Sequence, residues 1–270
     1  MVEVVEDAVV GLKLSEVSYP VLLSLYGETK KGKTYLGASF PNAIVIDFPP
    51  IKLGFGKLVI DQVGMNRTVG EGFRSLFEPK TRSGEIVWVP KIPGFDFKTQ
   101  YRFVRNYTEF MGAIEHARLR ASTIEPGKGR VWVVFDDTYR WRALEVANWV
   151  SRNGNKWPSI QQFGQITQTM QGIITEVQNF ANVLLISRMV KNYDTGEYGP
   201  QVYPSGSDYL ADASFEITTT VDESTGRTVP LVKIHSCGNR YACDPDFVRE
   251  LRDPTPQKLL EALGIPKELW

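Results

Sequence analysis

A short segment rich in glycine and lysine contains the residue types that bind phosphate. Residues 27–34 read GETKKGKT and match the pattern G-x-x-x-x-G-K-[ST] in full. In such a loop the glycines turn backbone N–H groups toward the phosphates, the lysine neutralises the β and γ oxygens, and the hydroxyl binds magnesium. The pattern does not choose between ATP and GTP; we predict a nucleoside triphosphate with Mg²⁺, bound by Gly27, Glu28, Thr29, Lys30, Lys31, Gly32, Lys33, Thr34 and Tyr35.

A second acidic position is expected, because a phosphate loop works with a distant acid that orients the magnesium ion. The segment RVWVVFDDTY supplies Asp136 and Asp137 directly after an apolar run. We predict Asp136 as the magnesium-orienting residue beside Thr34, and Asp137 as a residue that polarises the attacking water. The alternative for both is a capping acid, since Asp commonly begins the next helix. No G-x-G-x-x-G dinucleotide motif follows any apolar run.

The elements that must position these residues alternate along the chain. Apolar runs predict strands over residues 20–27, 43–48, 131–137 and 182–187, and a late hairpin over residues 214–236. Helices are predicted over residues 33–40, from about Tyr107, over 139–150 and over 160–180. Strands that alternate with helices indicate an α/β fold with a mainly parallel sheet, and the late hairpin adds antiparallel strands. We expect one domain over residues 1–270, with an insertion or irregular β segment at about 50–106 and a short helical tail at about 254–270.

Composition limits the possible partners and compartments. The 31 basic and 31 acidic residues cancel, so a nucleic-acid surface must be a local patch. No apolar run reaches membrane-spanning length, so we expect no membrane partner. The acidic N-terminus does not resemble a signal peptide, and the two cysteines, Cys237 and Cys243, do not form a disulfide framework. We therefore expect a reducing cytoplasm.

The chain resembles the RecA-like P-loop ATPases, and within them the small phage-encoded ATPases of recombination or single-strand annealing. The resemblance rests on the order and spacing of GETKKGKT, AIVIDF, VWVVFDD, NVLLISR and SDYLADASFEI, and spans residues 20–241. It implies a RecA-like core, ATP hydrolysis with Mg²⁺, and single-stranded DNA as partner. It also implies a homo-oligomer with nucleotide at the subunit junctions, in a prokaryotic or virus-infected cell.

The same resemblance raises a question about the catalytic base. RecA-like enzymes usually place a glutamate two residues beyond the aspartate that Asp47 matches, and that position is Pro49 here. Proline cannot act as a base, so Asp47 and Asp137 are the remaining acids. We therefore expect hydrolysis to be slow or to use a different base.

Two further roles follow from the resemblance. The end of NVLLISR matches the strand end where the family places a γ-phosphate sensor, with Ser187 and Arg188 as candidates; the alternative is a solvated surface arginine. Related hexameric motors carry a Lys-x-Arg finger on the last strand. This chain has Gly238-Asn239-Arg240, so Arg240 alone is the candidate finger, against a plain hairpin-end arginine.

Two segments are candidates for DNA contact. The first follows the strand at 182–187; because aromatic rings stack on bases and cations track the backbone, we predict contacts from Lys191, Tyr193, Tyr198 and Tyr203. The alternative is a tyrosine-rich hairpin packed on the domain. The second is residues 64–106, where eight Arg or Lys face four Asp or Glu among interleaved aromatics. That composition fits equally a small β insertion with its own core or a subunit interface.

Three function classes therefore remain open. The leading one is a DNA-directed RecA-like ATPase. The rivals are an oligomeric motor or switch ATPase with a protein partner, and a nucleotide-binding module with little hydrolysis, which Pro49 favours. The two histidines, His116 and His235, are far apart in the sequence and are interpreted as structural.

Overall fold

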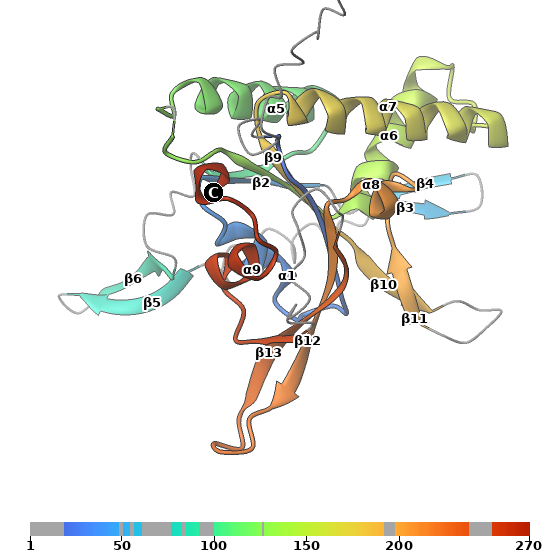
Figure 1. Ribbon diagram of the computed structural model, residues 1–270. Helices are drawn as coiled ribbons and strands as arrows, with labels where there is room; N and C mark the ends of the chain where they lie inside the picture. Colours follow the sequence, from blue (N-terminus) through green and yellow to red (C-terminus); the bar gives the residue numbers. More distant parts are fainter. Residues whose placement is uncertain are drawn as a thin grey trace, which may run out of the picture.

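The computed structural model describes residues 19–48, 51–54, 57–60, 77–82, 85–91, 100–125, 127–191, 198–237 and 250–270. Within them, one central sheet carries eight strands in the order β14-β13-β12-β1-β9-β8-β2-β7 (Figure 1). Its strands are β1 (Leu22–Tyr26), β2 (Ala43–Asp47), β7 (Tyr101–Phe103), β8 (Trp132–Asp136), β9 (Asn182–Ile186), β12 (Ala213–Val221), β13 (Thr228–Cys237) and β14 (Glu250–Arg252).

Strand direction divides this sheet into two parts. The strands from β12 through β1, β9, β8 and β2 to β7 run parallel. Strands β13 and β14 continue the sheet antiparallel beyond β12. The predicted α/β class, a mainly parallel sheet with a C-terminal antiparallel hairpin, is confirmed. Because the parallel strands share one direction, their carboxyl ends meet at one edge, and loops that follow different strands are brought together there.

Helices cover both faces of the sheet (Figure 1). On one face lie α5 (Tyr107–Ser122), α6 (Thr138–Arg152) and α7 (Ile160–Gln178), and on the other lie α1 (Lys33–Ala38) and α9 (Pro256–Ala262). The remaining short helices are α8 (Ser207–Leu210) and the 3₁₀ turn Lys267–Leu269.

The central strands are mostly apolar because both of their faces are covered. Alternate residues enter opposite cores: Leu23 and Leu25 pack with α1 and α9, whereas Leu22 packs with α5, α6 and α7. The strand period of two therefore divides each apolar run between the two layers.

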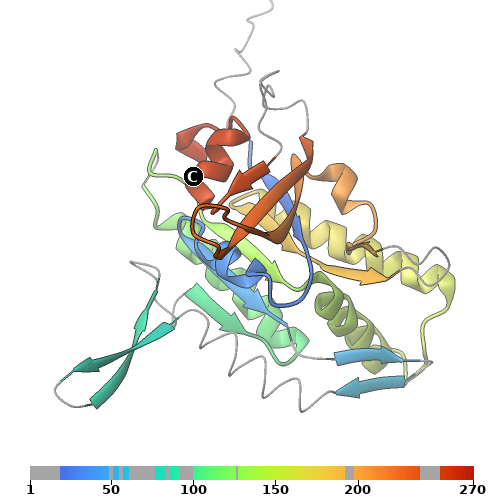
Figure 2. The same ribbon diagram turned by 90° about the horizontal axis from the view of Figure 1, so that it is seen from below.

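The segment predicted as an insertion at 50–106 contains three different structures. Hairpins β3–β4 (Ile51–Gly54, Lys57–Ile60) and β5–β6 (Phe77–Arg82, Glu85–Pro90) form separate two-stranded sheets, which Figure 2 shows outside the central sheet. Strand β7, by contrast, pairs with β2 in the central sheet. The residues that form β7 therefore belong to the central sheet and not to a separate β segment. A third hairpin, β10–β11 (Arg188–Lys191, Tyr198–Gln201), follows β9.

The C-terminal tail packs into the core. Leu259, Leu260 and Leu269 are buried against the α1 face of the sheet. The Arg130 amide donates to the Trp270 carbonyl at 3.2 Å, and the Asn182 side chain donates to the Leu269 carbonyl. A Cβ at Gly129 would stand 1.5 Å from the Trp270 carbonyl oxygen, so this close approach requires a glycine.

Candidate functional site

The phosphate loop, residues 27–34, begins directly after β1 and ends in α1. A Cβ at Gly27 would stand 2.4 Å from the Ile217 carbonyl oxygen of β12, so no other residue fits there. Gly32 precedes α1 with a φ of 93°, and Lys30 has a φ of 68°, so both lie in the left-handed region. The glycines of the motif are therefore required by the backbone path itself.

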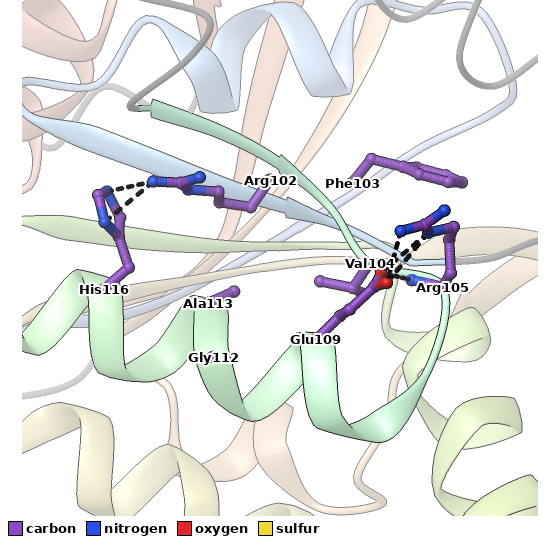
Figure 3. Close-up of a pocket in the computed structure, with 8 residues that line it drawn as sticks. All are labelled: Arg102, Phe103, Val104, Arg105, Glu109, Gly112, Ala113 and His116. Carbon is purple, nitrogen blue, oxygen red and sulfur yellow. Dashed lines mark hydrogen bonds and ion pairs between the residues drawn. The ribbon is translucent and has the colours of Figure 1, made fainter.

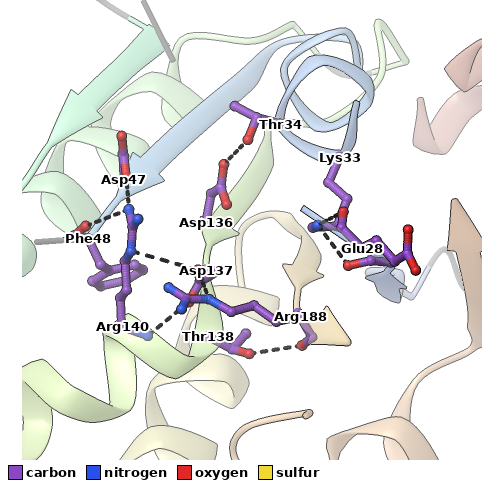
Figure 4. A network of polar contacts seen from close by, with 12 residues as sticks. Glu28, Lys33, Thr34, Asp47, Phe48, Asp136, Asp137, Thr138, Arg140 and Arg188 are labelled. Carbon is purple, nitrogen blue, oxygen red and sulfur yellow. Dashed lines mark hydrogen bonds and ion pairs between the residues drawn. The ribbon is translucent and has the colours of Figure 1, made fainter. Parts of the chain in front are cut away.

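Lys33 is the first residue of α1, and its ammonium group turns back onto the loop. Nζ donates to the carbonyl oxygens of Gly27 at 2.8 Å and Glu28 at 2.7 Å (Figure 4). Burial lowers the pKa of Lys33, and the nearby carboxylates of Asp136 and Asp137 act in the opposite direction. An ammonium has three donors, so one N–H is left for a phosphate oxygen.

Thr34 and Asp136 meet although they are 102 residues apart. The Thr34 hydroxyl donates to a carboxylate oxygen of Asp136, the last residue of β8 (Figure 4). Burial raises the pKa of Asp136, and the Thr34 hydrogen bond opposes that shift. Among the described residues, no group of three or more His, Cys, Asp or Glu is arranged so that it could hold a metal ion by itself. One hydroxyl and one carboxylate fit Mg²⁺, which protein sites hold through one or two carboxylates together with the phosphates of a nucleotide.

Asp137 follows directly and begins α6. One of its oxygens accepts from the Arg140 amide at 2.9 Å, which makes it the N-cap, and the other accepts from Arg188 Nε at 2.6 Å. The Arg140 guanidinium lies 3.8 Å from the same carboxylate. Asp137 therefore caps α6, as the alternative interpretation predicts, and it also forms an ion pair with Arg188 at the start of β10.

Asp47 ends β2 in register with Asp136 of β8. Its carboxylate accepts from the Tyr101 hydroxyl and lies 3.5 Å from Arg140 Nη1. The side chain is almost completely buried, and this burial, together with the charge of Asp136, raises the pKa of Asp47 well above its usual range. Asp47 and Asp137 thus share the guanidinium of Arg140.

The end of β9 contributes the predicted sensor residues. Ser187 is buried, and its hydroxyl lies 2.9 Å from the Thr138 hydroxyl in α6. Arg188 pairs with Asp137 and lies with Cζ 5.0 Å from the centre of the Tyr139 ring. Both residues therefore stand at the same sheet edge as the phosphate loop and the acids.

Arg188 also begins a continuous row of neighbouring arginine and aromatic side chains, which we name the Arg–aromatic row; its ring pairs are tilted or edge-to-face. Tyr139 and Tyr203 have ring centres 6.2 Å apart, and Arg142 lies 4.4 Å from the Tyr203 centre and 5.0 Å from that of Phe163. The Trp157 ring follows at 6.2 Å from Phe163. Every member is partly exposed. The row comprises Arg188, Tyr139, Tyr203, Arg142, Phe163 and Trp157.

The other predicted nucleotide-binding residues form the wall of the loop. Lys31 donates to the Thr219 hydroxyl at 3.2 Å and lies 3.8 Å from the Glu28 carboxylate. Tyr35 is 43% exposed. Thr29 lies in the turn between Glu28 and Lys31.

Some predicted residues lie outside the described residues: Tyr193, Pro49 and Arg240. Lys191 and Tyr198 face each other in the β10–β11 ladder, and only their backbone is described.

Two polar residues of the site were missed by sequence reasoning. Arg140 links Asp47 to Asp137, and its position three residues after Asp137 on a predicted helix was a usable signal. Tyr101 holds Asp47 from β7, within a segment predicted to be an insertion. No local pattern marks it, because only strand pairing brings it to β2.

Comparisons with known proteins give fold-level likenesses. No protein-family model and no curated protein sequence matches the chain. The KaiC-like protein of the archaeon Pyrococcus horikoshii aligns with a TM-score of 0.38 and 11% identity, over 82% of this chain and 81% of that one. An ATPase from the type III secretion system of pathogenic bacteria aligns with a TM-score of 0.43 and 13% identity, over 75% of this chain. This chain spans only 53% of that ATPase.

The geometry is that of an α/β P-loop domain. The parallel sheet, the phosphate loop after β1 and the acid at the end of β8 carry that assignment in this chain's own geometry. No helix among the described residues is long and apolar enough to cross a membrane.

Proposed function

We propose that the protein is an ATPase that binds ATP with Mg²⁺ at residues 27–35 and Asp136. The observation that carries the proposal is the contact between the Thr34 hydroxyl and the Asp136 carboxylate beside a glycine-defined loop. Lys33 exchanges its loop carbonyls for phosphate oxygens, and the backbone of the loop surrounds the triphosphate. A bound magnesium ion supplies neutralisation of the charge that develops on the phosphates.

Water activation is assigned to Asp137, with Asp47 as the residue that positions it through Arg140. Asp137 is the more accessible of the two acids, whereas Asp47 is enclosed between Tyr101 and Arg140. Arg188 Nε donates to the Asp137 carboxylate at 2.6 Å, so this ion pair has to open before Asp137 can contact the attacking water. Slow basal turnover follows.

Single-stranded DNA is the proposed partner, and the Arg–aromatic row is the support for it. Rings stack on bases without regard to sequence, and arginines add cation–π and phosphate contacts. The row starts at Arg188, which is paired with Asp137, and extends along α6 to α7. Nucleotide that pulls Arg188 away from Asp137 would therefore also alter the stack at Tyr139, so ATP binding and DNA binding are coupled. Recombination or strand annealing is the process that fits such a protein.

Assembly completes the proposal. We infer a homo-oligomer with nucleotide at the subunit junctions, in which Arg240 of one subunit reaches the phosphates bound by its neighbour. An arginine supplied in trans makes turnover depend on assembly.

The test is ATP turnover with and without oligothymidylate, with Lys33→Ala as the blank. We expect DNA to stimulate turnover, and we expect Tyr203→Ala to lose most of that stimulation because base stacking is worth about 1–3 kcal/mol per base. Arg118→Ala is the matched control, because Arg118 also stacks on a ring, Phe180, but outside the row. Stimulation should fall steeply with salt.

Other outcomes of this test point to the rival functions. ATP turnover without any response to DNA contradicts the DNA partner and favours a motor or switch with a protein partner. Tight nucleotide binding without turnover favours a nucleotide-binding module.

A further inference from the structure

A cavity of about 500 Å³ lies at the edge of the central sheet, between β7 and α5. Figure 3 shows Arg102 and His116 at one end of it, Arg105 and Glu109 at the other, and Gly112 between them on the helix. This volume lies in the range of small-molecule sites. The cavity belongs to the α5 face of the sheet, whereas the phosphate loop is followed by α1 on the opposite face.

Arg102 is the residue that gives the cavity its charge. Its Nη2 lies 3.0 Å from His116 Nδ1 and 3.1 Å from Nε2, so one N–H is directed at the edge of the imidazole. Its Nε is buried and has no hydrogen-bond partner in the described part of the chain. Within that part, no carboxylate forms an ion pair with Arg102. The positive charge of Arg102 is therefore not balanced by a carboxylate in the described residues, and an anion in the cavity would balance it.

The acid at the other end does not supply this anion. Glu109 accepts from Arg105 Nη2 at 2.7 Å, from Arg105 Nε at 3.1 Å and from the Arg105 backbone amide at 2.8 Å. These bonds occupy the carboxylate, and they lower the pKa of Glu109. The charge of Glu109 is therefore balanced locally, and that of Arg102 is not.

Gly112 leaves the wall of the cavity open. A Cβ added there meets no atom within 4 Å, so no close packing in the described structure requires a glycine. Glycine inside a helix costs about 1 kcal/mol relative to alanine. The missing side chain leaves room for a molecule above α5.

We propose that this cavity binds a small anionic molecule through a phosphate or carboxylate group. Arg102 donates to the anion with the N–H groups at the end of its guanidinium that His116 leaves free, and His116 orients the guanidinium. The site is separate from the nucleotide site and does not depend on the proposed ATPase function. The two are joined by one strand only: Tyr101, next to Arg102, points to the other face and donates to Asp47.

Calorimetric titration of the full chain tests this site, with inorganic pyrophosphate and citrate as the phosphate and carboxylate probes. Lys33→Ala is the background, so that the phosphate loop contributes as little as possible. We expect one probe to bind at a single site, and Arg102→Gln to weaken it about tenfold or more, as for loss of a charged hydrogen bond. The probe that binds more tightly identifies the anion class.

A second variant keeps the test decisive if Arg102→Gln does not fold. Gly112→Leu fills the cavity without changing charge and improves helix propensity, so it should abolish binding and leave thermal stability intact. Gly172→Leu in α7 is the matched control, since a Cβ there also meets no atom within 4 Å. Absence of binding by both probes, or binding that neither Arg102→Gln nor Gly112→Leu weakens, overturns the proposal.

Discussion

At the scale of single residues, the site is a balance of three acids and three cations at the ends of adjacent strands. Asp47, Asp136 and Asp137 face Arg140, Arg188 and Lys33, and Arg140 is shared by two of the acids. Burial of these carboxylates disfavours their charged forms, which raises the pKa of Asp47 and Asp136. The site therefore favours the approach of further positive charge, as a magnesium ion brings.

The two candidate bases can be separated by amide variants. Asp137→Asn keeps an N-cap for α6, since asparagine caps as well as aspartate, but it cannot accept a proton. We expect it to lower kcat about 10²- to 10⁴-fold while leaving ATP affinity nearly unchanged. Asp47→Asn keeps an acceptor for Tyr101 and should lower kcat much less. Steady-state turnover and nucleotide titration measure both effects, and the reverse order of the two variants would assign the base to Asp47.

At the scale of elements, α6 links the nucleotide end of the sheet to the surface and to the core. Its N-cap is Asp137, its first turns carry Arg140 and Arg142, and Glu145 points into the interior. The Glu145 carboxylate accepts from Trp141 Nε1 at 3.0 Å. Burial raises its pKa to about 7, so a neutral acid is held inside the helix layer at low pH.

Because burial raises the pKa of Glu145, we expect the free energy of unfolding to depend on pH. Between about pH 4.5 and about pH 7 the folded protein binds more protons at Glu145 than the unfolded chain does. The contribution of Glu145 to the free energy of unfolding is therefore greatest below that window and decreases by ~3 kcal/mol as pH rises through it. Glu145→Gln keeps the acceptor for Trp141 without the charge. It should be more stable than the parent at about pH 8, and lose that advantage near pH 4.5.

Urea unfolding at the two pH values measures the effect. Glu115→Gln in α5 is the control, because it makes the same exchange of carboxylate for amide at an exposed position. An unchanged stability difference between parent and Glu145→Gln across the window would contradict the raised pKa.

At the scale of the whole molecule, the C-terminal tail closes the α1 side of the sheet. Leu259, Leu260 and Leu263 join the same buried cluster as Leu23 and Leu25 of the strand that carries the phosphate loop. The tail is therefore part of the core on the α1 side, and its loss would expose the apolar strands next to the phosphate loop.

The tail should consequently control global stability. Leu260 is fully buried, so Leu260→Ala should cost about 2–5 kcal/mol of unfolding free energy. Leu119→Ala in α5 is the control, because Leu119 is 59% exposed and should change stability by less than about 0.5 kcal/mol. Chemical denaturation measures both. A Leu260→Ala value as small as the control would mean that the tail is dispensable.

Local pattern alone determined a large part of this protein. Short stretches of sequence predict the phosphate loop, Asp136 and Asp137 at the end of β8, and the strands of the parallel core. They do so because a glycine's φ, a strand period and a helix cap depend on near neighbours in the sequence. Strands predicted at 43–48, 131–137 and 182–187 form at 43–47, 132–136 and 182–186, and the α/β class follows from their alternation with helices.

The tertiary structure determines which residues of other elements contact these strands and loops. Strand register places Asp47 next to Asp136, and the edge pairing of β7 brings Tyr101 to Asp47 and Arg102 to the cavity over α5. Tertiary packing places the Arg142 guanidinium over the Tyr203 ring, and the C-terminal tail packs against the α1 face of the sheet. None of these contacts has a local signature, because each joins residues whose separation along the chain is fixed only by folding. The nucleotide loop was therefore predictable from sequence, whereas the residues that pair with its acids, and the second cavity, were not.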